Sequence, residues 1–96
     1  MASNAATLSE RIRDSLKEVI DPELGRDIVS LGLIYGIEAS EEGVVHITMT
    51  TTVPGCPAAG FIVDAVRFAS STVEGVNSTA VHLIYEPRWR PEMISA

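Results

Sequence analysis

The residues best suited to chemistry surround the chain's single cysteine, in the segment Thr50-Thr51-Thr52-Val53-Pro54-Gly55-Cys56-Pro57. Proline fits the first position of a helix, so Pro57 predicts that Cys56 is a helix N-cap. The unpaired amides and the dipole at a helix N-terminus favour a thiolate over a thiol. A turn at Pro54 and Gly55 is expected to keep bulky side chains away from the sulfur. The segment therefore predicts an exposed, reactive thiol.

Such a thiolate can act as a nucleophile, a sulfur carrier or a ligand of a soft metal ion. The residues around Cys56 do not choose among these uses. The alternative is a buried structural cysteine, because free cysteine packs as a small hydrophobic residue. One soft ligand leaves most of a metal's coordination sphere open, so we expect weak metal binding by one chain. Stable binding is expected only across a dimer or with a partner.

Carboxylates and histidines supply the other candidate groups. Asp21 and Glu23 flank Pro22, where they could be oxygen ligands or a general base, or simply a turn that ends a helix. His46 and His82 are expected at exposed or edge positions of strands, and His46 is too far along its strand to be a base for Cys56. The sequence has no Ser-His-Asp spacing, no glycine-rich phosphate loop and no CxxC pair. We therefore predict no catalytic residues and a protein that is not an enzyme.

Trp89 is the only tryptophan and lies between Arg88 and Arg90 in the tail. An aromatic side chain in this setting either folds back over the domain or binds a partner. Folding back is the simpler interpretation, and Trp89 is the candidate partner-binding residue.

Hydrophobic periodicity predicts the elements that position these groups. Apolar residues at helical spacing predict helices over 8–20 and 57–73, and Thr7 with Glu10 has the form of a capping box. Alternation predicts strands over 33–38, 44–50 and 76–85. In the second strand, one face carries three apolar side chains, from Val45, Ile47 and Met49.

The predicted order is α-β-β-α-β, an α/β (α+β) arrangement. One apolar face of a three-stranded sheet needs a cover, and two amphipathic helices are available, so a two-layer sandwich follows. The long link that contains the second helix predicts a right-handed crossover, and hence a parallel strand pair in an otherwise antiparallel, mixed sheet. The strand order is left open.

Length and composition predict one soluble domain. The 96 residues fit a single domain over 1–96, with 1–6 expected to be flexible. A net charge of −6 with no basic stripe argues against binding to nucleic acid or anionic membranes. No apolar run reaches about 18 residues and the N-terminus does not resemble a secretion signal. We therefore expect a cytoplasmic protein whose thiol is reduced.

Three motifs in order resemble one known family over nearly the whole chain. The opening motif is Leu16–Leu24 followed by Asp27–Tyr35, the central one is Ile47–Thr50 followed by Pro54–Pro57, and the closing one is Glu86–Trp89 followed by Pro91–Met93. These motifs are similar to those of the family long called domain of unknown function fifty-nine, which contains SufT-like and PaaD-like proteins. The resemblance implies a fold similar to the C-terminal domain of NifU.

The resemblance also implies a role in maturing iron–sulfur proteins. The family cysteine falls on Cys56, which would carry a metal, cluster or sulfur. Asp21, Glu23, Thr50 and Thr52 would support it. The implied cofactor is a transient iron–sulfur cluster or iron. The implied partners are client apoproteins and other iron–sulfur assembly proteins, with a homodimer as a further possibility.

Two alternatives stay open beside this role. The chain could be a non-catalytic adaptor that binds client apoproteins, with Cys56 structural, or a PaaD-like component of phenylacetate degradation. One thiol cannot hold a cluster in the four-cysteine manner. The other ligands would then come from a second chain, a small thiol or the carboxylates. We expect Asp21 or Glu23 to lie at the same end of the sheet as Cys56.

Overall fold

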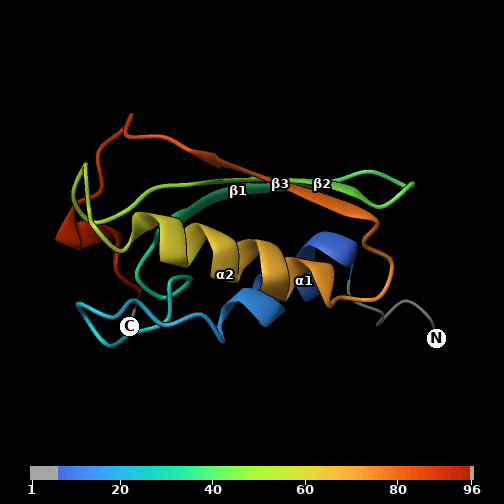
Figure 1. Ribbon diagram of the computed structural model, residues 1–96, viewed down its shortest axis with the longest axis horizontal. Coiled ribbons are helices and arrows are strands. Elements are labelled where there is room, and N and C mark those ends of the chain that lie inside the picture. Colours follow the sequence, from blue (N-terminus) through green and yellow to red (C-terminus); the bar gives the residue numbers. More distant parts are fainter. Residues whose placement is uncertain (1–6, 96) are drawn as a thin grey trace.

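The computed structural model describes residues 7–95, which form a three-stranded sheet with two helices on one face (Figure 1). The elements follow the predicted order: α1 (Leu8–Leu16), β1 (Ile34–Ala39), β2 (Val44–Met49), α2 (Ala59–Ser71) and β3 (Ser78–Leu83), with a 3-10 helix, η2 (Pro91–Met93), in the tail. The predicted two-layer α/β sandwich is confirmed. Within the described residues, neither helix is long and apolar enough to cross a membrane.

Helix α1 begins at the predicted capping box. The Thr7 hydroxyl accepts from the Glu10 amide, and the Glu10 carboxylate accepts from the Thr7 amide. The helix ends at Leu16, so the predicted end at residue 20 is wrong. The reason is tertiary: Val19 accepts a backbone hydrogen bond from Ile28, and residues 20 and 27 form an antiparallel bridge. The apolar spacing continues into this extended segment because Val19 is still buried.

Strand β2 is the central strand of the sheet. It pairs antiparallel with β1 and parallel with β3, which gives the order β1-β2-β3. The predicted parallel pair is therefore confirmed. The strands lie within one residue of the predicted ranges for β1 and β2, whereas β3 is two residues shorter at each end than the predicted 76–85.

The two faces of the sheet have different surroundings. Val45, Ile47 and Met49 of β2 are fully buried beneath the helices, as the alternation predicts. They pack in one core with apolar side chains from every layer, among them Ile12, Leu16, Leu31, Leu33, Ile62 and Val66. On the other face, Val44 and His46 are exposed, and both helices lie on the opposite side of the sheet (Figure 1).

The C-terminal tail folds back over the domain. The Tyr35 hydroxyl donates to the Pro87 carbonyl at 2.8 Å, and the Trp89 indole N–H donates to the Leu31 carbonyl at 2.6 Å. A side chain at Gly32, whose φ is +79°, would collide with the Met93 carbonyl oxygen. The folding back of Trp89 is thus confirmed, and the close approach of the tail requires glycine at position 32.

Asp27 closes a turn between the small bridge and the core. Its Oδ2 accepts from the Ser30 amide at 2.9 Å. Partial burial raises the pKa of the Asp27 carboxyl. Hydrogen bonds from Ser30 and the Val29 amide, with the charge of Lys17, lower it by more, so the pKa lies below the ordinary value of 3.8. The charged form is therefore the one that the fold stabilises.

We expect Val45→Ala to lower the free energy of unfolding by about 1.5–3 kcal/mol, because it removes buried methyl groups and leaves a cavity. Val44→Ala is the matched control: it is the neighbouring residue on the other face, 41% exposed, and should change stability by less than about 0.5 kcal/mol. Urea denaturation measures both. Equal losses in the two variants would contradict the assignment of the faces.

A second prediction follows from the lowered pKa of Asp27. Its contribution to stability is fully present above the unfolded-state pKa, near 3.8, and is lost as the pH falls through the lower folded-state value. Asp27→Asn should therefore cost about 0.5–1 kcal/mol at pH 6 and progressively less below about pH 4. Denaturation of both proteins across this range tests the sign. A difference that grows towards acid pH would refute it.

Candidate functional site

Hydrogen bonds fix the loop that follows β2. The Thr50 amide donates to the Leu33 carbonyl at 2.9 Å, and its side chain is fully buried. The Thr51 hydroxyl donates to the Val53 carbonyl at 2.6 Å and shares a 2.9 Å hydrogen bond with the Tyr85 hydroxyl. These bonds join the loop to one segment that precedes β1 and to another that follows β3. Sequence reasoning chose Thr50 and missed Thr51, although the unbroken run of threonines was the available signal.

Cys56 lies at the end of this loop, beneath the surface. Its side chain is free of any disulfide and only 6% exposed, so the predicted exposed thiol is wrong. The Cys56 carbonyl accepts from the Ala59 amide at 3.0 Å, which forms a turn before the helix. Helix α2 therefore begins at Ala59, with Ala58 as N-cap, and the predicted cap at Cys56 with Pro57 in the first turn is also wrong.

The burial of Cys56 limits access to its thiol from solvent. Val53, Pro54 and Gly55 are exposed, whereas the Cys56 side chain is buried, as is common for a free cysteine. The arrangement suits a thiol that is protected in the free chain and uncovered on binding to another molecule.

Asp21 is buried as well, at 2% exposure. Its Oδ1 accepts from the amides of Glu23 at 2.7 Å and Leu24 at 3.2 Å, so the carboxylate holds the turn after Pro22. Within residues 7–95, Asp21 forms no salt bridge. The Glu23 side chain is exposed.

The loops that carry Asp21 and Cys56 lie at the same end of the sheet, as expected (Figure 1). A site shared by Cys56 with Asp21 or Glu23 stays a prediction, as do the supporting roles of Thr50 and the half-buried Thr52. Trp89 is held by its bond to Leu31, and partner binding by this residue also stays a prediction.

Metal-ligating side chains are sparse around Cys56. Across residues 7–95, no three histidine, cysteine or acidic side chains come together in a way that could hold a metal ion. In this part of the chain, Cys56 therefore does not belong to a complete set of metal ligands.

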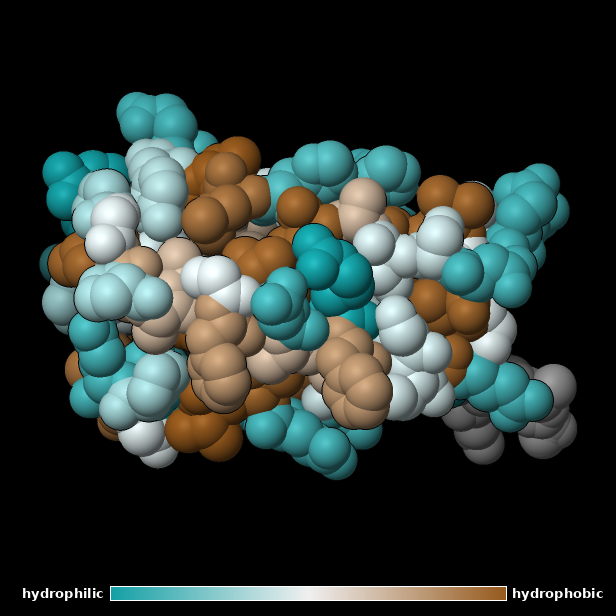
Figure 2. Space-filling view, in the orientation of Figure 1, coloured by the Kyte–Doolittle hydropathy of each residue, from teal (hydrophilic) through white to brown (hydrophobic). Residues whose placement is uncertain are grey.

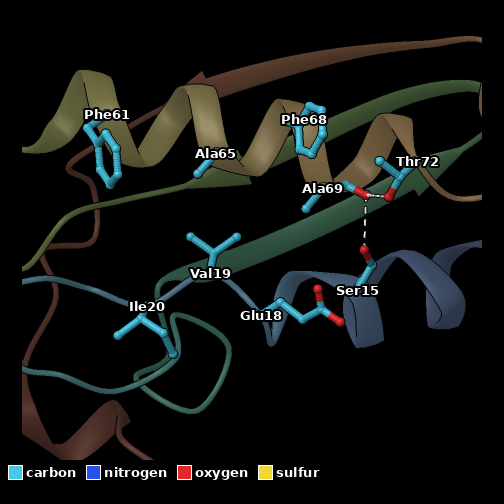
Figure 3. Close-up of a pocket in the computed structure, with 9 residues that line it drawn as sticks. All are labelled: Ser15, Glu18, Val19, Ile20, Phe61, Ala65, Phe68, Ala69 and Thr72. Atoms are coloured by element: carbon cyan, nitrogen blue, oxygen red, sulfur yellow. Dashed lines mark hydrogen bonds between the residues drawn. The ribbon is translucent and has the colours of Figure 1, made fainter.

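An apolar groove runs between the two helices (Figure 3). Its volume is about 490 Å³, and its walls include Val19, Ile20, Phe61 and Phe68. Phe61 and Phe68 are 68% and 72% exposed. Apolar side chains gather over α2 on this face of the molecule (Figure 2). The Ser15 hydroxyl donates to the Ala69 carbonyl at 2.9 Å and joins α1 to α2.

The two histidines form a pair that sequence reasoning missed. His46 Nδ1 and His82 Nε2 lie 3.0 Å apart on the open face of the sheet. Both side chains are exposed, as expected. Their contact depends on the parallel pairing of β2 and β3, in which His46 lies opposite Ala80 and Thr48 opposite His82. The alternation of side chains along β2 and β3 was the available signal, because it places both histidines on the outward face. It cannot show that the two are neighbours until the strand order is known.

Comparison with known proteins finds a matching family model and several similar proteins. A family model described as iron–sulfur cluster assembly protein matches residues 9–83. The chain is 47% identical to the Fe-S protein maturation auxiliary factor YitW of Bacillus subtilis, over 92% of this chain and 86% of that one. It is 38% identical to an iron–sulfur cluster carrier protein of Mycobacterium tuberculosis, over 79% of this chain but only 20% of the carrier.

A solved structure agrees with the fold. The crystal structure of a domain of unknown function, DUF59, from Bacillus anthracis superposes with a TM-score of 0.87 at 44% sequence identity, covering 92% of this chain and 84% of that one. The two chains therefore agree in the path of the backbone as well as in the arrangement of helices and strands.

The burial of Cys56 predicts slow alkylation in the native state. Iodoacetamide should react more than about tenfold faster with the unfolded protein, because native attack waits for local opening. Tyr85→Phe removes the bond to Thr51 and should raise the native rate about fivefold, the equivalent of about 1 kcal/mol. Tyr35→Phe is the matched control, since its hydroxyl binds the tail at Pro87. Equal native and unfolded rates would contradict the buried position.

Proposed function

Because the chain belongs to the iron–sulfur cluster assembly protein family, we propose that it is an auxiliary factor in the maturation of iron–sulfur proteins. In this role Cys56 holds iron, sulfur or a cluster transiently and passes it to a client apoprotein. The observation that carries the proposal is the burial of the single thiol, in the hydrogen-bonded loop that follows the central strand. The thiol is protected until a partner opens the loop.

The lack of a complete ligand set within residues 7–95 supports a shared cargo. One thiolate from this chain combines with ligands from a second chain, a small thiol or the client itself. Thiolates are the usual ligands of iron–sulfur clusters. Iron or a cluster that this chain holds through few ligands is also released readily, as transfer to a client protein requires.

The buried carboxylate of Asp21 is a further candidate for this site. The loop that carries it lies at the same end of the sheet as the loop of Cys56 (Figure 1), and burial of a carboxylate costs free energy unless hydrogen bonds or charges compensate for its lost hydration. Two backbone amides offset part of that cost. We propose that Asp21 supports the site mainly by holding its loop, and that the exposed Glu23 is free to approach a bound ion.

A second candidate function is that of an adaptor, favoured by the apolar groove between α1 and α2. In the mycobacterial carrier, the part similar to this chain makes up one-fifth of the protein. In that protein, the part similar to this chain is joined to a longer remainder in one chain. We propose that the occupant of the groove is a separate cluster carrier protein, bound through apolar contacts with Phe61 and Phe68.

Anaerobic reconstitution with iron and sulfide separates the two functions. Wild type, Cys56→Ser and Cys56→Ala are compared by visible absorbance, by iron content per chain and by activation of an apo iron–sulfur enzyme. In parallel, Phe61→Ala and Phe68→Ala are tested for binding to a cluster carrier protein that lacks such a domain. Val44→Ala, an exposed substitution on the opposite face, is the control for binding.

The carrier function predicts a cluster in the wild type that both Cys56 variants lose, together with loss of activation. The adaptor function predicts activation that survives in Cys56→Ser and binding that falls at least about tenfold in the phenylalanine variants. A cluster retained by both Cys56 variants would refute the role of the thiolate. Unchanged carrier binding by Phe61→Ala and Phe68→Ala would refute the groove as the docking site.

A further inference from the structure

The open face of the sheet carries a group of ligating side chains that the proposed function does not use. His46 extends from β2 and His82 from β3, and both are exposed. Their rings are nearly parallel, at 10°, with centroids 5.3 Å apart and with Nδ1 and Nε2 3.0 Å apart. The rings therefore meet edge to edge through these nitrogens.

The geometry points to a binding site for a divalent first-row transition ion at His46 and His82, on the face of the sheet away from the helices. Imidazole nitrogens bind such ions at about 2.0–2.1 Å, so two of them on one tetrahedral ion are about 3.3 Å apart. The observed separation of 3.0 Å is close to that value. The two exposed rings must turn out of their hydrogen bond before both nitrogens point at one ion.

A carboxylate lies on the neighbouring strand, although the described residues contain no group of three side chains placed to hold an ion together. The register of β1 and β2 pairs Glu38 directly with His46, so both side chains are on the open face. Glu38, Ser40, Val44 and His46 line part of a hollow of about 300 Å³. The hollow provides space for the ion's remaining water ligands. A pair of imidazoles, with water as the remaining ligands, suits Zn²⁺ or Ni²⁺ and does not suit Mg²⁺.

The backbone supports the pair rigidly. Both histidines lie on strands that are hydrogen-bonded in the sheet, and β2 is held on both sides. Little backbone entropy is then lost on binding, in contrast to a site on a mobile loop. When the ion binds, the ring that donates the hydrogen bond between the two histidines loses the hydrogen from that nitrogen. The same ring takes up a proton on its other nitrogen.

Zn²⁺ titration of the untagged full-length chain by calorimetry tests the site, with nitrogen NMR of the imidazoles as a second readout. We expect one Zn²⁺ per chain, with shifts at His46 Nδ1 and His82 Nε2 and no response to Mg²⁺. His46→Asn and His82→Asn should each weaken binding at least about tenfold. The double variant should be little worse than either single one, because both lose the same chelate. Backbone NMR spectra report whether these surface variants keep the fold.

Two matched comparisons complete the test. Glu38→Gln should weaken Zn²⁺ binding by at most a few-fold, because it removes a negative charge opposite His46, whereas Glu41→Gln, which removes an exposed acid of the neighbouring hairpin loop, should leave it unchanged. Cys56→Ser should also leave it unchanged, so the result does not depend on the function proposed for the thiol. The inference is overturned if the wild type shows no saturable binding, if the histidine variants bind as tightly as the wild type, or if binding disappears in Cys56→Ser.

Discussion

The rest of the structure depends on the pairing of β2 with a strand on each side. β2 forms the antiparallel ladder with β1 and the parallel ladder with β3, and one of its faces supplies the centre of the core. The backbone hydrogen bond from Thr50 to Leu33 extends this pairing beyond the last residue of the strand. The point at which the chain leaves the sheet, and with it the position of Cys56, is set by these contacts.

The same pairing couples the core to the open face. Side chains alternate along a strand, so burial of Val45 and Ile47 requires His46 to point away from the helices. A slip of one residue would expose the valine and isoleucine and bury the histidine. The cost of that slip keeps His46 beside His82. The packing of one face thus positions the ligating groups on the other, without any contact between the two.

Much of the architecture was predictable because it rests on local physical chemistry. The capping box at Thr7 and Glu10, the apolar stripes of both helices and the alternation of β2 depend on residues a few positions apart. A link long enough to contain a helix implies a parallel pair, and that pair is present. The motifs around Asp21 and Cys56 indicated the family for the same reason: each is a short run of residues whose types can be read directly.

The sequence by itself determined the order of elements, the buried face of β2 and the single thiol available for chemistry. Tertiary structure alone decided where α1 ends, since Val19 leaves the helix to pair with Ile28. It also decided that Cys56 is buried rather than exposed, and that His46 meets His82. These features arise from contacts between residues distant in the chain. Local propensity carries no information about such contacts, because their free energy appears only when the layers pack together.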